Sequence, residues 1–223
     1  MLIVNGPLKA VLLKSRFFFS WFSFCEIYSS IYNITLGDYM RNEDITQGNI
    51  YHIYNRGVDR QKIFFSARNM GFFLFRLRKY FDKENISLYA YCLISNHYHL
   101  LIKVEKQNFG LKVMQPFLTS YTKAINLQQD RVGPLFQGSF KGKLMPSVEI
   151  ALYASKYIHL NPVKAKLVRH PVEWQYSSYK EYLIPTNKPF VKKDLILSFF
   201  KTPQAYESFV LNEEDGYHDS FED

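Results

Sequence analysis

Cysteine is scarce in this chain: Cys25 and Cys92 are the only two among 223 residues. Two cysteines cannot form a disulfide framework, and they cannot hold a structural zinc ion with thiolates alone. Long apolar runs are also lacking. The nearest candidate, residues 17–25, is far shorter than the roughly 20 residues that a membrane-spanning helix needs. These absences predict a protein of a reducing, cytoplasmic compartment that does not associate with a membrane.

Acidic residues are outnumbered, with 20 Asp and Glu against 28 Lys and Arg, which gives a net charge of +8. Their distribution is uneven, because the last eleven residues contain six acidic residues and no Lys or Arg. Residues 1–212 therefore carry +14. A basic body of this kind suits a polyanion, most simply nucleic acid. A solvated surface with no particular ligand is the alternative that charge leaves open.

The chain is long enough for one substantial core and an appendage. Met40 reads as a natural start, so we expect residues 1–39 to be an upstream extension with poor order. Residues 40–185 are expected to form the main domain. Residues 186–223 are expected to form a small helical extension that ends in the acidic tail.

Hydrophobic patterning predicts four extended segments and three helices. The extended segments are 50–55, 86–94, 98–104 and 136–145, and the helices are 67–82, 111–128 and 147–161. The first helix is expected to pack through Phe72, Phe73, Phe75 and Leu77. The β-α-β-β-α-β order indicates an α+β, ferredoxin-like antiparallel sheet with two helices on one face. The other face would then be available to a ligand.

A pair of histidines, His97 and His99, lies at the start of the third extended segment. Residues i and i+2 of a strand point to the same face, so the two imidazoles should project side by side. Two adjacent imidazoles can share one divalent metal ion. Two ordinary histidines at a strand edge are the alternative, since this short pattern has little specificity by itself.

The predicted helix 147–161 begins with Ser147 as a plausible N-cap residue. The i, i+4, i+8 spacing of Tyr153, Tyr157 and Asn161 places them along one helical face. Pro162 is expected to end the helix at Asn161. Asn161 then offers a carbonyl oxygen to a hard cation, and Tyr157 offers a nucleophile. For any one of the 17 tyrosines, packing is the more common role.

Together these residues resemble the single-tyrosine HUH transposases, the insertion-sequence 200/605-like family and its REP-associated relatives. The resemblance is carried by the histidine pair and by Tyr-Ile-His-Leu-Asn-Pro-Val-Lys at 157–164. Three further stretches contribute: Tyr-His-Ile-Tyr-Asn-Arg-Gly at 51–57, Gly-Pro-Leu-Phe-Gln-Gly at 133–138, and the segment 174–179. It implies that Tyr157 is the nucleophile and that His97, His99 and Asn161 are the metal ligands. Some insertion-sequence members carry glutamine where this chain has Asn161. The asparagine of this chain agrees with the REP-associated type.

The resemblance further implies strand transfer on single-stranded or hairpin DNA through a 5′-phosphotyrosine. The mixed nitrogen and oxygen donor set favours Mg²⁺ or Mn²⁺ over zinc. Tyr54, Phe136 and Phe140 are candidates for base stacking, although core packing is the better interpretation for most of them. His52 is a candidate for contact with the strand, whereas His159 should point away from the site. The candidate DNA contacts are basic: Arg56, Arg60, Lys62, Lys141, Lys143, Lys156, Lys164 and Lys166.

Several alternatives stay open at this point. Dimers are common in the family, so a homodimer and a monomer are both compatible with the residues. A non-catalytic nucleic-acid-binding module on the same fold, similar to an RRM, gives no reason for His97, Tyr157 and Asn161 to converge. A metal-dependent phosphoesterase would use the histidine pair with activated water and form no covalent adduct with DNA.

Overall fold

The computed structural model describes residues 45–81 and 84–212. The predictions for residues 1–39 and for the acidic tail lie outside the described residues. Within the described ranges, no helix is both long enough and apolar enough to cross a membrane.

Four antiparallel strands form one sheet with the spatial order β2-β3-β1-β4. Helix α2 connects β1 to β2, and α3 connects β3 to β4. The central position of β1 and β3 is the ferredoxin-like arrangement, so the predicted fold class is confirmed. The bounds are β1 Ile50–Arg56, α2 Ala67–Tyr80, β2 Ile86–Ile94, β3 His97–Val104, α3 Gln115–Gln128 and β4 Lys141–Met145.

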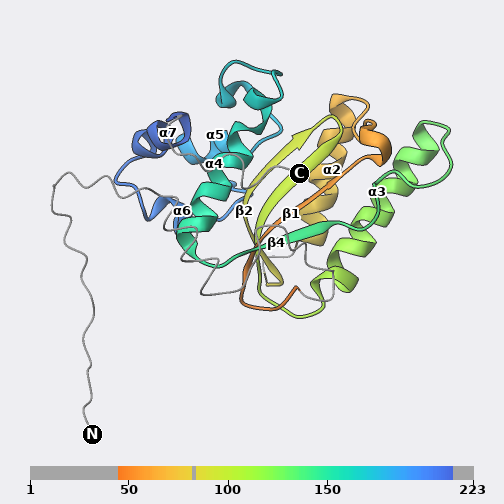
Figure 1. Cartoon of the computed structure of the whole chain (residues 1–223), viewed down its shortest axis with the longest axis horizontal. Helices are drawn as coiled ribbons and strands as arrows, with labels where there is room; N and C mark the ends of the chain where they lie inside the picture. Colours follow the sequence, from red (N-terminus) through yellow and green to blue (C-terminus); the bar gives the residue numbers. More distant parts are fainter. Residues whose placement is uncertain (1–44, 82–83, 213–223) are drawn as a thin grey trace, which may run out of the picture. The chain divides into compact units, whose positions relative to one another are not determined.

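Helices α2 and α3 cover one face of the sheet (Figure 1). Helix α2 begins at Ser66, whose side chain accepts a hydrogen bond from the Asn69 amide at 3.4 Å. The ring of Phe73 on α2 lies 5.1 Å from Tyr98 of β3 and 4.8 Å from Phe117 of α3. The prediction that Phe75 packs in this core is wrong, since its side chain is 64 % exposed. Two positions along a helix from Phe73, it points away from the sheet.

The opposite face is covered over β2 and β3 by helix α4, Val148–Lys164 (Figure 1). The expectation of an uncovered second face is therefore wrong for that half of the sheet. Ser147 caps the helix, as predicted, by accepting a hydrogen bond from the Ile150 amide at 3.3 Å.

The predicted end of this helix at Asn161 is also wrong, because α4 continues through Pro162 to Lys164. Pro162 gives up only its own amide donor. The chain then closes the helix with two hydrogen bonds, from Leu167 N–H to Pro162 O at 3.0 Å and from Lys166 N–H to Val163 O at 2.9 Å. Lys166 adopts a φ of 56°, the left-handed conformation that such a helix ending requires.

Three short helices follow along the chain: α5 Tyr179–Leu183, α6 Asp194–Leu197 and α7 Pro203–Leu211. They pack against the outer side of α4. A buried polar cluster joins them. His159 Nδ1 lies 2.7 Å from Tyr206 Oη, and His159 Nε2 lies 2.8 Å from Ser178 Oγ. Tyr206 Oη also lies 3.1 Å from Ser155 Oγ. His159 therefore points toward Tyr206 and Ser178 and away from the histidine pair, as predicted.

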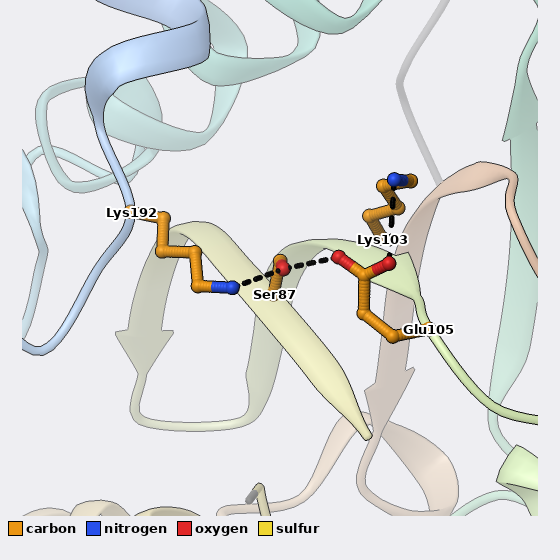
Figure 2. A network of polar contacts seen from close by, with 4 residues as sticks. All are labelled: Ser87, Lys103, Glu105 and Lys192. Carbon is orange, nitrogen blue, oxygen red and sulfur yellow. Dashed lines mark hydrogen bonds and ion pairs between the residues drawn. The ribbon is translucent and has the colours of Figure 1, made fainter. Parts of the chain in front are cut away.

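A polar network at the start of β2 and the end of β3 fixes the segment before α6 to the sheet (Figure 2). Lys192 donates from its amide to Leu88 O and from Nζ to Ser87 Oγ, both at 2.8 Å. Ser87 in turn donates to Glu105, whose other carboxylate oxygen lies 3.3 Å from Lys103 Nζ. The hydrogen bond from Ser87 is the main reason that the pKa of Glu105 is lowered.

The fourth extended segment is shorter than the predicted 136–145. Strand β4 begins at Lys141, and Phe136 forms an isolated bridge with Gly57. Between them, Gly138 has a φ of 76°, which an extended strand does not allow. The remaining boundaries lie within a few residues of the predicted ones.

Candidate active site

The histidine pair lies at one end of β3, on the face of the sheet that α4 covers. His97 and His99 project to the same side, with ring centroids 4.9 Å apart. Their cross-strand partners on β1 are Arg56 and Tyr54, respectively. Because directly paired residues share a face, these two side chains belong to the same surface. Strand pairing therefore places an arginine and a tyrosine directly beside the histidines.

His97 is held by an asparagine on each side. Its Nδ1 lies 2.7 Å from Asn96 Oδ1, and its Nε2 lies 3.0 Å from Asn161 Oδ1. Two ligands at right angles on a Mg²⁺ ion, each about 2.1 Å from it, lie about 3.0 Å apart. The separation between His97 Nε2 and Asn161 Oδ1 therefore fits two neighbouring ligands of one such ion.

His99 is fully buried, and its Nδ1 lies 2.9 Å from Nε2 of His52, a residue of β1. His99 Nε2 is buried and has no hydrogen-bond partner in the described part of the chain. A buried nitrogen of this kind normally has a partner, because leaving it without one costs about 1–3 kcal/mol. A metal ion would provide that partner. His97, His99 and Asn161 thus fit a divalent ion.

Burial keeps all three imidazoles neutral. Desolvation, assisted by the neighbouring His97 and His52, holds the pKa of His99 well below its ordinary value. Desolvation, followed by the charge of Lys143, lowers the pKa of His52 to about 3. The pKa of His97 is also lowered, mainly by desolvation. Neutral imidazole is the form that binds a metal ion.

Tyr157 reaches this site from α4. Its ring meets the ring of His99 edge to face at 5.5 Å and that of His52 at 5.9 Å. Asn161 lies one helical turn further along, which explains how one helix brings both a hydroxyl and an amide to the histidines. Tyr153, one turn earlier, packs instead against Phe209 of α7 at 5.4 Å. Of the three residues at the i, i+4, i+8 spacing, Tyr157 and Asn161 lie at the histidines.

The sequence itself matches a known family. The sequence model for "Transposase IS200 like" matches residues 46–161, just over half of the chain. The chain belongs to the IS200-like transposase family. The match includes all four residues that meet at the site, and it ends at Asn161.

The structure is similar to a solved structure described as the "REP associates tyrosine transposase bound to a REP hairpin". The TM-score is 0.51 at 14 % identity, over 65 % of this chain and 84 % of that one. At this identity the likeness shows the fold alone. A bacterial tRNA(His) guanylyltransferase-like protein in complex with GTP also matches, at 10 % identity over 66 % of this chain and 77 % of that one, but its TM-score of 0.31 supports no argument. A search of the curated proteins found no match.

Two of the predicted DNA contacts of this IS200-like transposase line a shallow pocket beside the histidines. The pocket is formed by Tyr54, Asn55, Arg56, Gln137 and Lys141. Arg56 Nε donates to Gln137 Oε1 at 2.7 Å, and Lys141 Nζ lies 5.8 Å from the centre of the Tyr54 ring.

Five of the remaining predicted contacts lie elsewhere around the site, and one of them, Lys166, is exposed just after α4. Lys164 lies over the Tyr157 ring, with Nζ 4.8 Å from its centroid. Arg60 lies in the turn that follows β1 and Lys62 lies just after it, and both are exposed. Lys143 of β4 is the cross-strand partner of His52 on β1.

The assignment of Lys156 to DNA binding is withdrawn, since this residue is only 2 % exposed. Its ammonium group donates to Asn212 O and lies 5.0 Å from the centre of the Phe209 ring. The three aromatic residues considered for base stacking, Tyr54, Phe136 and Phe140, are all buried, which agrees with core packing.

The sequence suggested His52 as a contact to the DNA strand, but its side chain is fully buried and lies against His99 instead. A histidine in an apolar strand gives no sign of its partner. The ferredoxin-like order contains one signal: β1 and β3 are neighbours, so histidines on both strands can meet on one face. In the described ranges no group of three His, Cys, Asp or Glu side chains is arranged to hold a metal ion.

Proposed function

We propose that this protein is a metal-dependent, single-stranded DNA transposase that cleaves and rejoins DNA through a 5′-phosphotyrosine. The proposal is carried by one observation: Tyr157 on α4 packs against His99, while Asn161 on the same helix lies 3.0 Å from His97. A nucleophile and three metal-ligating groups thus meet at one end of the sheet. Family membership supports the class of reaction.

In the proposed reaction, Tyr157 Oη attacks the scissile phosphorus. A bond forms between Oη and phosphorus, and the bond between phosphorus and the 3′-oxygen breaks. The hydroxyl proton of the tyrosine is lost, and the leaving 3′-oxygen takes up a proton to become a free 3′-OH. Because the phosphodiester energy is kept in the tyrosine ester, attack by another 3′-OH reverses these steps and joins two strands without ATP.

His97, His99 and Asn161 would hold the divalent ion, Mg²⁺ or Mn²⁺. When bound, such an ion polarises a non-bridging phosphate oxygen and offsets charge in the transition state. Lys164 lies beside the nucleophile, where its charge attracts the phosphate. The aromatic contacts with His52 and His99 hold the Tyr157 ring in one orientation, which favours in-line attack.

The DNA is proposed to approach over β1 and β4. Helix α4 covers the sheet over β2 and β3, so the strand cannot cross there. The pocket with Arg56 and Lys141 lies on the opposite side of the histidines and carries the positive charge that a phosphate backbone requires. The similar solved transposase is described as bound to a REP hairpin, which supports a hairpin beside the cleavage site here as well.

Two alternatives are less well supported. A non-catalytic module similar to an RRM gives no reason for Tyr157 and Asn161 to meet the histidines, yet they do. It would also place exposed aromatic side chains on the central strands, whereas Tyr54 is 5 % exposed. A phosphoesterase that uses activated water would not need Tyr157 at the metal ligands.

The test uses the purified chain, Mn²⁺ and single-stranded hairpin oligonucleotides from the flanks of its own gene, labelled at the 5′ or the 3′ end. Denaturing gels should show a protein–DNA adduct that carries the 3′-labelled fragment. Tyr157→Phe should form no adduct. Tyr153→Phe, which alters a tyrosine one turn away on the same helix, should keep it. Cleavage without an adduct would show a hydrolytic phosphoesterase and overturn the proposal.

A further inference from the structure

The turn between β1 and α2 is tied to the histidine strand through Asn96. The Gly57 amide donates to Asn96 O at 2.9 Å, and Asn96 Nδ2 donates to Arg60 O at 3.3 Å. Gly57 leaves no room for a side chain, because a Cβ there would lie 2.1 Å from Gln61 O. Asp59 and Arg60 both adopt a positive φ, 51° and 57°. The chain maintains an unfavourable backbone here, and one result is that the Arg60 carbonyl meets Asn96.

This contact determines how the Asn96 amide is oriented. A backbone carbonyl can only accept a hydrogen bond, so the atom of Asn96 that faces Arg60 O must be the donor, Nδ2. The other atom, Oδ1, then faces His97 Nδ1 at 2.7 Å. Since Oδ1 can only accept, His97 Nδ1 must carry the proton.

The proton on Nδ1 has a direct consequence for the opposite nitrogen. In a neutral imidazole only one nitrogen is protonated, so His97 Nε2 carries a lone pair. That lone pair faces Asn161 Oδ1 at 3.0 Å, so two acceptor atoms lie side by side. Such a pair repels unless a positive charge or a donor lies against both atoms, and a divalent cation provides that charge.

We propose that Asn96 is a positioning residue that fixes His97 in the Nδ1–H tautomer, so that Nε2 is available to a divalent cation. The turn 57–61 holds Asn96 in place through Arg60 O. This inference rests on the metal site of the proposed function, but it concerns a residue that is not one of the proposed metal ligands. It also gives a role to Gly57, the last residue of the 51–57 motif, which the proposed reaction does not use.

The proposal is tested on the full chain by titrating Mn²⁺ without DNA and measuring the unbound ion by electron paramagnetic resonance. Asn96→Ala removes the acceptor, and Mn²⁺ should bind about 10-fold to 100-fold more weakly, the usual effect of losing a partner of a metal-ligating histidine. Asn96→Asp keeps an acceptor for His97 and should bind Mn²⁺ nearly as tightly as the unaltered protein. Long-range proton–nitrogen spectra of the metal-free protein should show the Nδ1–H tautomer for His97 and its loss in Asn96→Ala.

Asn126→Ala is the matched control, because Asn126 Nδ2 also donates to a loop carbonyl, Gly133 O at 2.8 Å, away from the site. It should leave Mn²⁺ affinity unchanged. Equal weakening in Asn96→Ala and Asn96→Asp would overturn the proposal, since the bond to Arg60, not the acceptor, would then matter. Unchanged affinity in Asn96→Ala would also overturn it. His97→Ala separates a failure of the proposed function from a failure of this inference. If His97→Ala still binds Mn²⁺ normally, the metal site of the proposed function is wrong. If His97→Ala loses Mn²⁺ binding while Asn96→Ala binds normally, only the role of Asn96 is refuted.

Discussion

Acid should destabilise this protein through its buried neutral histidines, and His159 gives the clearest test because it lies outside the candidate active site. Burial lowers the pKa of His159 to about 3, against 6.5 in an unfolded chain. Because the folded-state pKa is the lower one, the unfolded state takes up the proton first. The contribution of neutral His159 to the free energy of unfolding is therefore complete above about pH 6.5. It is lost as the pH falls toward 3.

The size of the effect follows from the difference between the pH and the unfolded pKa. At about pH 5 the solution is about 1.5 units below the pKa of an unfolded histidine, and each unit corresponds to about 1.4 kcal/mol. Because His159 stays neutral in the folded state, the free energy of unfolding should be about 2 kcal/mol lower at that pH than above about pH 6.5. His52, with a pKa also lowered to about 3, adds a loss of similar size in the unaltered protein.

The assay is urea unfolding, followed by circular dichroism, at about pH 7.5 and about pH 5. His159→Gln should be less stable at the higher pH because it loses hydrogen bonds to Tyr206 and Ser178. Between the two pH values, however, it should lose about 2 kcal/mol less than the unaltered protein. Ser178→Ala removes one of the same hydrogen bonds but keeps the imidazole, so its pH dependence should stay steep. Equal losses in His159→Gln and the unaltered protein would refute the reasoning.

Three further changes test other parts of the structure. His52→Phe removes the partner of His99 Nδ1 and should weaken Mn²⁺ binding about 10-fold, which a Mn²⁺ titration measures; unchanged affinity would remove His52 from the site. Lys141→Met should weaken binding of single-stranded DNA and reduce the slope of log affinity against log salt by about 0.7, as a fluorescence titration measures. Lys156→Met, at a buried position, should change neither the affinity nor the slope. Identical effects of the two changes would contradict the assignment of Lys141 to DNA binding. Lys166→Gly relieves a left-handed residue at the end of α4 and should raise the free energy of unfolding by about 1 kcal/mol; a loss in urea unfolding would contradict this.

Much of the fold was predictable because its signals are local. Apolar runs rich in β-branched and aromatic residues indicate the strands at 86–94 and 98–104, and Ser147 marks the start of α4 by its capping side chain. The end of α4 was mispredicted because Pro162 is a local signal for a helix end, whereas Lys166 gives no sign of its left-handed conformation. Only the hydrogen bonds that close the helix show where it stops.

The candidate site divides in the same way. His97 and His99 share a face because of the two-residue period of a strand, and Tyr157 and Asn161 because of the four-residue spacing of a helix. The meeting of these two pairs depends on the packing of α4 on the sheet, which only the family resemblance indicated. Lys156 was misassigned for a related reason: its charge is visible in the sequence, but the side chain of Phe209 and the carbonyl of Asn212 that receive it are not.

The packing of α4 on both sides has a consequence for protein fragments. The family match ends at Asn161, but the outer face of the helix is buried by residues that come later, among them Ser178 and Tyr206. A fragment cut at Asn161 would retain Tyr157 and the three proposed metal ligands and would expose Ser155, Lys156 and His159 to water. The shortest piece of this chain that folds should therefore extend through α7, some fifty residues beyond the last residue that takes part in the proposed reaction.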